Sequence, residues 1–197
     1  MLFIETPISG AFAVDLEPRG DDRGFFARAF CADEFAAHGL SMTIAQANLS
    51  WSAHAGTMRG LHFQLPPFAE SKFIRCVRGA VFDVIVDLRP ESVTFGQHVG
   101  MELSAENRRA MFVPERCAHG LLTLTDDSEV FYPVGAPYQP GLESGLRFDD
   151  PDLDIDWPIA AVHITEKDRS WPSFAARIDE IRQSMSLSDS APKNHGD

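Results

Sequence analysis

A short polar row lies between residues 59 and 64, where Arg59, His62 and Gln64 are interspersed with the large apolar residues Leu61 and Phe63. If this stretch is a β-strand, successive side chains point to opposite faces of the sheet. His62 and Gln64 then face one way while Leu61 and Phe63 face the other. The polar face of such a strand is expected to line a site.

Three residue types in and beyond this row suit one kind of chemistry. Removal of a proton next to a ketone needs a base with a pKa near neutrality, a cation that holds the developing enolate, and an acid that returns a proton. His62, Lys72 and Tyr132 supply these types, and Asp83 and His119 also lie in or beside strand-like runs. Spacing alone is a weak indication, because a histidine in a strand is more often structural than catalytic.

The elements that would position these residues are short apolar runs separated by turn residues. Their spacing is typical of an antiparallel sandwich or barrel, so we predict a double-sheet β-barrel. The predicted strands cover residues 76–78, 80–88, 98–103, 110–113, 120–124 and 129–132.

The longest predicted strand, residues 80–88, has two different faces. Its packing face carries the apolar residues Phe82, Val84, Val86 and Leu88. The opposite face carries Asp83 and Asp87 around Ile85 and is expected to line a cavity.

Helix is predicted only at the periphery. Residues 33–38 form a turn or two, and residues 174–185 carry apolar residues at helical spacing behind an N-cap residue, Ser173. Residues 133–151 are rich in Gly and Pro, which is typical of a long functional connection, and contain Tyr138 and Glu143. We predict one domain over residues 1–184 and a polar tail, residues 185–197, that frays.

Composition excludes several classes of partner. With 29 acidic and 17 basic residues among 197, the chain has a formal net charge of −12 and is not expected to bind nucleic acid or anionic membranes. Cys31, Cys76 and Cys117 show no zinc or redox spacing and are predicted to be reduced thiols. The N-terminus does not read as a signal peptide, and no apolar run reaches the length of a membrane span. We therefore expect a soluble, cytoplasmic protein.

An ordered series of motifs runs through most of the chain. It comprises Asp22–Phe26, Arg59–Gln64, Lys72, Gly79–Val84, Phe95–Gln97, Leu103–Asn107, Ala118–Gly120, Tyr132, Tyr138, Asp149–Pro151, Ile155–Pro158 and Lys167–Asp168. This series resembles the dTDP-4-dehydrorhamnose 3,5-epimerase family. Each motif alone is weak, but together, over about residues 15–168, they are highly specific.

The resemblance implies an all-β cupin domain, that is, a jelly roll or double-stranded β-helix with short peripheral helices, usually as a homodimer. It also implies an isomerase that epimerises C3, C5 or both of a nucleotide-linked 4-keto-6-deoxyhexose through an enolate and without a cofactor. By this resemblance His62 is the base and Asp168 orients its imidazole. Tyr132 returns the proton from the opposite face, and Lys72 stabilises the enolate oxygen.

The resemblance further implies residues that bind the nucleotide-diphosphate sugar. These are Arg23, Arg28, Gln46, Asn48, Arg59, His119, Tyr138, Glu143 and Lys167. Arginine suits a diphosphate because its guanidinium is permanently charged and donates in bidentate fashion. Arg28, Ala47 and Pro133 depart from the commoner pattern of glutamate, aspartate and lysine, so the nucleotide and the sugar stay open.

Other readings also stay open. Many cupins bind a metal, and His62, Glu70 and His119 suggest such a site, but Gln64 replaces the usual second histidine and we predict that no metal binds. The alternatives to double epimerisation are a single-carbon epimerase, a ketoisomerase and a non-catalytic sugar-nucleotide-binding cupin. The pathway, whether O-antigen, capsule or secondary metabolite, is not determined by the sequence.

Overall fold

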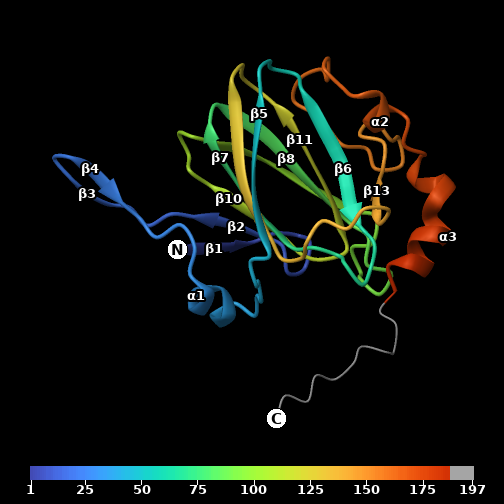
Figure 1. The fold of residues 1–197 in the computed structure, drawn as a ribbon, viewed down its shortest axis with the longest axis horizontal. Coiled ribbons are helices and arrows are strands. Elements are labelled where there is room, and N and C mark those ends of the chain that lie inside the picture. Colours follow the sequence, from blue (N-terminus) through green and yellow to red (C-terminus); the bar gives the residue numbers. More distant parts are fainter. Residues whose placement is uncertain (187–197) are drawn as a thin grey trace, which may run out of the picture.

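Two antiparallel β-sheets pack face to face in the computed structural model, which describes residues 1–186 (Figure 1). The first sheet contains β1 (Leu2–Glu5), β2 (Phe12–Asp15), β10 (Ala110–Val113), β7 (Lys72–Arg78), β12 (Ser128–Val134) and β5 (Gln46–Ser52), in that order. The second contains β13 (Glu143–Gly145), β6 (Met58–Gln64), β11 (Cys117–Thr123), β8 (Ala80–Asp87) and β9 (His98–Ser104). This arrangement confirms the predicted all-β, double-sheet class.

A two-stranded hairpin projects away from the sheets (Figure 1). It consists of β3 (Arg19–Asp21) and β4 (Gly24–Phe26), joined by a tight turn at Asp22 and Arg23. The hairpin was not predicted from the sequence. Its two phenylalanines, Phe25 and Phe26, are exposed to solvent in the single chain.

The predicted strand positions agree with the structure in the centre of the chain and fail near its ends. Strand β10 has the predicted bounds, whereas β7, β11 and β12 begin earlier than predicted. Strands β1 to β5 were not predicted. Residues 133–151 are not simply a connection, because β13 lies within them and pairs with β6.

The apolar core has an inner layer and two outer layers. Ile74, Ile85 and Met111 belong to the cluster between the sheets. Helix α1 (Ala32–Ala37) covers the outer face of the first sheet, and α3 (Phe174–Ser184) covers that of the second. The short helix α2 (Glu166–Arg169) lies beside β6.

Helix α3 begins as predicted and ends against the core. The Ser173 hydroxyl accepts a hydrogen bond from the Ala176 N–H, which confirms the predicted N-cap. Met185, which the sequence placed in a fraying tail, is fully buried, and its carbonyl accepts a hydrogen bond from Arg116 at 2.8 Å. The tail prediction for residues 187–197 lies outside the described residues. No helix among residues 1–186 is long and apolar enough to cross a membrane.

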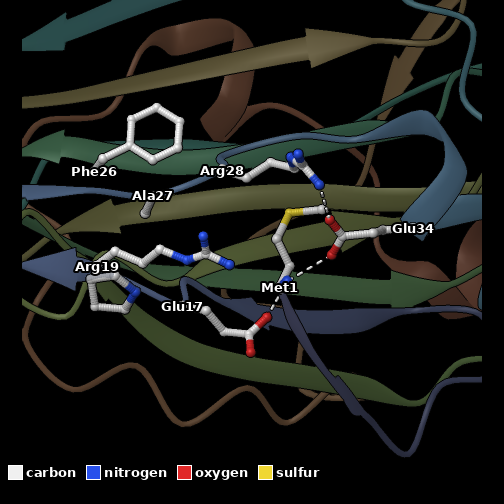
Figure 2. Close-up of a pocket in the computed structure, with 8 residues that line it drawn as sticks. Met1, Glu17, Arg19, Phe26, Ala27, Arg28 and Glu34 are labelled. Atoms are coloured by element: carbon white, nitrogen blue, oxygen red, sulfur yellow. Dashed lines mark hydrogen bonds and ion pairs between the residues drawn. The ribbon is translucent and has the colours of Figure 1, made fainter.

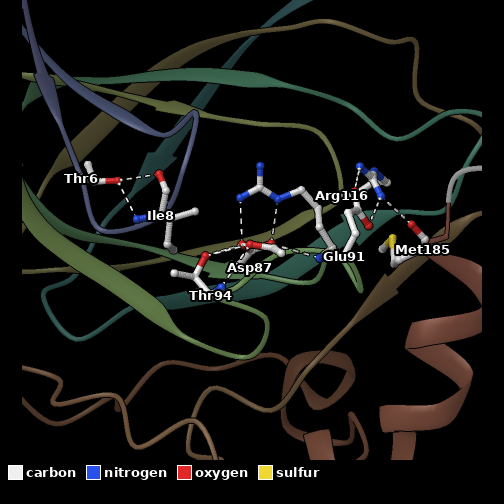
Figure 3. A network of polar contacts seen from close by, with 9 residues as sticks. Thr6, Ile8, Asp87, Glu91, Thr94, Arg116 and Met185 are labelled. Carbon is white, nitrogen blue, oxygen red and sulfur yellow. Dashed lines mark hydrogen bonds and ion pairs between the residues drawn. The ribbon is translucent and has the colours of Figure 1, made fainter.

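The two faces of β8 differ, but the prediction that Asp83 and Asp87 line a cavity is wrong for both: each is fully buried, and neither lines the pocket around His62. The buried carboxylate of Asp87 accepts hydrogen bonds from Nε and Nη2 of Arg89, both at 2.8 Å, and from the hydroxyls of Ser92 and Thr94 at 2.6 and 2.7 Å (Figure 3). The prediction that Asp87 lines a cavity is therefore wrong, because the loop that follows β8 folds back and surrounds the carboxylate. Asp87 instead fixes this loop.

Replacement of Asp87 by asparagine tests this role. Burial opposes ionisation of Asp87, but the hydrogen bonds from Arg89, Ser92 and Thr94 outweigh it and hold the pKa of this carboxyl below its ordinary value. We expect Asp87→Asn to lower the free energy of unfolding by about 3 kcal/mol at neutral pH, because it leaves a guanidinium without its counter-ion.

The pH dependence has a definite sign. Since the folded pKa is depressed, the stabilisation is complete above the unfolded value of 3.8 and is lost as the pH falls through the folded value. Denaturant unfolding over a pH series should therefore show the variant and the wild type converging at low pH. The exposed control Asp22→Asn should match the wild type throughout, and a constant gap at all pH values would contradict the role given to Asp87.

Candidate active site

A cavity with two lobes lies between the sheets, and both lobes are lined by His62, Lys72 and Tyr132. The first lobe, here the amide lobe, measures about 270 Å³ and is also lined by Gln46, Asn48, Gln64, Glu70, Tyr138 and Glu143. The second, here the cation lobe, measures about 320 Å³ and is also lined by Ser50, Arg59, His119, Thr165, Lys167 and Asp168. The structure therefore brings together most of the predicted site residues.

Strand β6 presents its polar row to this cavity, only partly as the alternation predicted. His62 and Gln64 line the cavity, whereas Leu61 and Phe63 pack in the apolar cluster under α3, although Phe63 also borders the amide lobe. Arg59 lines the cavity too, against strict alternation, because the β6–β11 register shifts between Arg59 and His62. Gln64 holds the neighbouring loop, because its amide donates to the carbonyls of Phe68 and Pro137 and accepts from the Gln139 N–H at 2.7 Å. Within residues 1–186, no three histidine, cysteine or acidic side chains are grouped so that they could hold a metal ion.

His62 is paired with a buried carboxylate. Its Nε2 lies 2.5 Å from Oδ1 of Asp168, which is 4% exposed and sits on α2. Burial acts to raise the pKa of Asp168, but hydrogen bonds from His62, Thr165 and the Gly60 N–H lower it overall. Because Asp168 is an ionised acceptor, Nε2 donates to it, and Nδ1 is left as the nitrogen that can take a proton.

Lys72 and Tyr132 come from the opposite sheet. The Lys72 ammonium lies 2.6 Å from Oε1 of Glu70, and both side chains are nearly buried. Tyr132 lies opposite Asn48 in the β12–β5 pairing. Burial and the charge of Glu70 raise the pKa of Tyr132, and Arg59 lowers it, with a net rise. The phenol is therefore protonated at neutral pH and can donate a proton.

A second histidine and carboxylate pair lies beside the first. His119 on β11 is directly opposite His62 on β6, and its Nε2 lies 2.8 Å from Oδ1 of the fully buried Asp83. The other oxygen of Asp83, Oδ2, has no hydrogen-bond partner among residues 1–186. The guanidinium of Arg59 contacts neutral groups, donating to Ser52 Oγ and to the Trp51 carbonyl, both at 3.1 Å.

The remaining predicted binding residues close the outer side of the cavity. Lys167 on α2 and Glu143 on β13 form an ion pair of 2.5 Å that connects the two lobes. The Gln46 side chain accepts a hydrogen bond of 2.6 Å from the Tyr138 N–H.

Arg23 and Arg28 do not reach this cavity in the single chain. Arg23 lies at the tip of the β3–β4 hairpin, is paired with Asp21 and has an 89% exposed side chain. Arg28 bonds Glu34 at 3.0 Å and lines a separate pocket beside the amino group of Met1 (Figure 2). Their predicted role in substrate binding therefore stays a prediction, because within one chain neither residue lines the cavity around His62.

Sequence reasoning missed two residues that line the cation lobe, Ser50 and Thr165. Ser50 follows Gln46 and Asn48 at spacings of two along β5, and this alternation could have revealed it. Thr165 is the N-cap of α2, and it also contributes to the low pKa of Asp168. Glu70 had been considered only as a metal ligand, and its position beside Lys72 was not foreseen.

Comparison with known proteins gives consistent results. A family model described as dTDP-4-dehydrorhamnose 3,5-epimerase matches residues 5–176. The enzyme of that name from Methanothermobacter thermautotrophicus is 44% identical over 172 residues, which cover 86% of this chain and 92% of that protein. A dTDP-4-dehydrorhamnose 3-epimerase from Streptomyces niveus is 40% identical over 163 residues, covering 82% of this chain and 78% of that protein.

A solved structure shows the same fold. The Legionella pneumophila dTDP-6-deoxy-D-glucose-3,5-epimerase, in complex with dTDP-4-keto-L-rhamnose, superposes with a TM-score of 0.85 at 35% identity. The match covers 91% of this chain and 96% of that one.

The close approach of β6 and β11 at the site gives a prediction. A Cβ atom added to Gly60 would lie 2.5 Å from the Gly120 Cα and 3.0 Å from the His119 carbonyl oxygen, whereas one added to Gly24 would meet nothing within 4 Å. The two glycines have similar φ angles, +135° and +131°. We expect Gly24→Ala to cost about 1–2 kcal/mol of stability and Gly60→Ala about 3 kcal/mol more.

Denaturant unfolding of both variants measures the difference. Because the two glycines have similar φ angles, most of the excess at Gly60 reports the contact with β11. Equal destabilisation of the two variants would show that β6 and β11 can separate without cost.

Proposed function

Because the chain belongs to the dTDP-4-dehydrorhamnose 3,5-epimerase family, we propose that the cavity around His62 is its active site. The protein is an isomerase that epimerises C3, C5 or both of a nucleotide-linked 4-keto-6-deoxyhexose. The observation that carries the site assignment is the placement of His62 and Tyr132 on opposite sheets around one cavity. Epimerisation needs removal of a proton from one face of a carbon and its return to the other.

The first step is proton removal beside the ketone. The C4 carbonyl acidifies the hydrogens on C3 and C5, and Nδ1 of His62 takes one of them as a general base. Asp168 stabilises the imidazolium that forms, because its ionised carboxylate already accepts from Nε2. The Lys72 ammonium stabilises the negative charge that moves to the C4 oxygen.

The second step is return of a proton from the opposite wall. The Tyr132 hydroxyl donates to the enolate carbon, and its raised pKa keeps it available as an acid. No electron leaves the substrate, since one C–H bond breaks and another forms at the same carbon.

Substrate binding divides between the two lobes. In the cation lobe, Arg59, His119 and Lys167 suit the negative charge that the substrate carries and develops. In the amide lobe, Gln46, Asn48 and Glu143 supply hydrogen-bonding groups, and Tyr138, 56% exposed, offers a ring for stacking.

We propose that the protein acts as a homodimer. The outer face of the first sheet exposes Leu49, Trp51 and Phe131, with Leu49 and Phe131 directly opposite each other in the strand pairing. Such an apolar face on an edge strand is typical of a protein interface. In such a dimer, Arg23 on the projecting hairpin and Arg28 behind it would contribute to the cavity of the partner subunit.

A cytoplasmic location is part of the same proposal. Cys31, Cys76 and Cys117 are all free thiols, as expected for a reducing compartment.

The base and acid assignments are tested with a dTDP-linked 4-keto-6-deoxyhexose in deuterated buffer. His62→Ala should reduce both deuterium incorporation and epimerisation by roughly a thousandfold, because no other group takes the proton. With Tyr132→Phe, the substrate should still incorporate deuterium, while the amount of product with inverted configuration should fall. NMR of the sugar ring reports both quantities and identifies which carbon is labelled.

The outcomes separate the competing functions. A wild-type protein that binds the nucleotide sugar but leaves its C3 and C5 hydrogens unexchanged would be a binding cupin. Label at one carbon only would identify a single-carbon epimerase. Near-normal turnover by His62→Ala would overturn the assignment of the base.

The dimer is tested with Leu49→Glu. Two charges facing each other across the interface should give a monomer in sedimentation and lower kcat/KM roughly tenfold, although Leu49 points away from the cavity. Val93→Glu, at a loop residue that is 94% exposed, is the matched control and should behave as wild type. A wild-type protein that sediments as a monomer would refute the dimer.

A further inference from the structure

Glu70 is an acid inside the cavity that the steps above do not use. It lies between β6 and β7, and its carboxylate lies 2.6 Å from the Lys72 ammonium. The side chains of Glu70 and Lys72 are only 12% and 10% exposed. Glu70 lines the amide lobe together with His62 and Tyr132.

The charge of Glu70 opposes the chemistry of the site. The substrate carries a diphosphate and passes through an enolate, and a fixed carboxylate beside Lys72 repels both. Glu70 therefore contributes nothing by attraction of the substrate. Its contribution comes through Lys72, the group that it contacts.

Its effect on Lys72 is positional. A lysine side chain has several rotatable bonds, and an ammonium buried without a counter-ion is costly. The short contact with Glu70 uses one of the three N–H donors and fixes the direction of the other two. An ammonium held in this way needs no reorganisation when the enolate forms.

The charge of Glu70 also acts on Tyr132. Tyr132 shares the cavity with basic groups from β6, β7, β11 and α2, namely Arg59, His62, Lys72, His119 and Lys167. The acids that share the cavity are Glu70, Glu143 and Asp168. Burial is the largest cause of the raised pKa of Tyr132; the charge of Glu70 adds to the rise, and the charge of Arg59 opposes it.

We propose that Glu70 is a positioning residue that holds the Lys72 ammonium in place for the enolate. The proposal rests on the function given above, because only that reaction forms an enolate in this cavity. It gives Glu70 a role in the first half of the reaction, in which the enolate forms.

A first measurement follows the Tyr132 ring, which reports the charge of Glu70 in the folded protein. The chain has only two tyrosines, so protein labelled with carbon-13 at the tyrosine ζ carbon gives two signals, and Tyr132→Phe identifies the one to follow. In Glu70→Gln the Tyr132 signal should titrate at a lower pH than in the wild type, because the amide keeps the shape and loses the charge. Glu115→Gln, at an exposed position, is the control for net charge and should leave the titration unchanged.

Kinetics test the positioning role. Glu70→Asp, which keeps the charge but shortens the side chain, should lower kcat roughly tenfold, with KM changed less than about threefold. Circular dichroism confirms that each variant is folded.

The result that overturns the proposal is a Glu70→Asp variant with the kcat and KM of the wild type. An inactive wild-type protein would overturn the proposed function alone. An active wild-type protein whose kcat is unchanged by Glu70→Asp would overturn the role of Glu70 alone.

Discussion

The hydrogen bond between His62 and Asp168 connects two parts of the chain that are 106 residues apart, and the site is arranged around it. The segment that carries Asp168 is attached to the start of the strand that carries His62. Met58 N–H donates to the His163 carbonyl at 2.9 Å, and Val162 and His163 N–H both donate to the Gly56 carbonyl. These backbone hydrogen bonds hold the two segments side by side, so the carboxylate is already placed against the imidazole. The imidazole therefore keeps one tautomer.

The cavity is built from neutralised pairs. Each of four basic side chains contacts a carboxylate: His62–Asp168, Lys72–Glu70, His119–Asp83 and Lys167–Glu143. Without these basic partners, the four carboxylates would repel an anionic substrate, in a chain whose net charge of −12 already does so. Pairing gives each of these four donors a fixed direction, whereas the guanidinium of Arg59 contacts neutral groups and has no carboxylate partner among residues 1–186.

The strands that could be predicted are those whose apolar residues face the core. Strand β5 reverses the usual pattern, because Asn48 and Ser50 face the polar cavity while Leu49 and Trp51 face outward. An expectation of apolar residues inside and polar residues outside therefore misses it. Strand β13 has only three residues among glycines and prolines, and it exists because β6 pairs with it, a tertiary effect that local pattern does not contain. In the same way, family resemblance identified Arg23 without indicating that it lies on a hairpin outside the cavity.

The geometry also bears on how one site could serve two carbons. C3 and C5 both neighbour the C4 carbonyl, so a sugar whose C4 oxygen stays on the Lys72 ammonium can turn about that contact and present either carbon to the cavity. In the proposed mechanism, His62 and Tyr132 can keep their places, because they lie on strands of opposite sheets. On that mechanism, the choice between one and two epimerisations would depend on the room for rotation, which is set by residues that line the lobes without reacting. Gln64 is the clearest of these, since its amide holds the loop around Pro137 and Gln139, whose Tyr138 lines the amide lobe. Specificity for the number of carbons would then be a property of the cavity wall, and the proposed proton chemistry would be common to both outcomes.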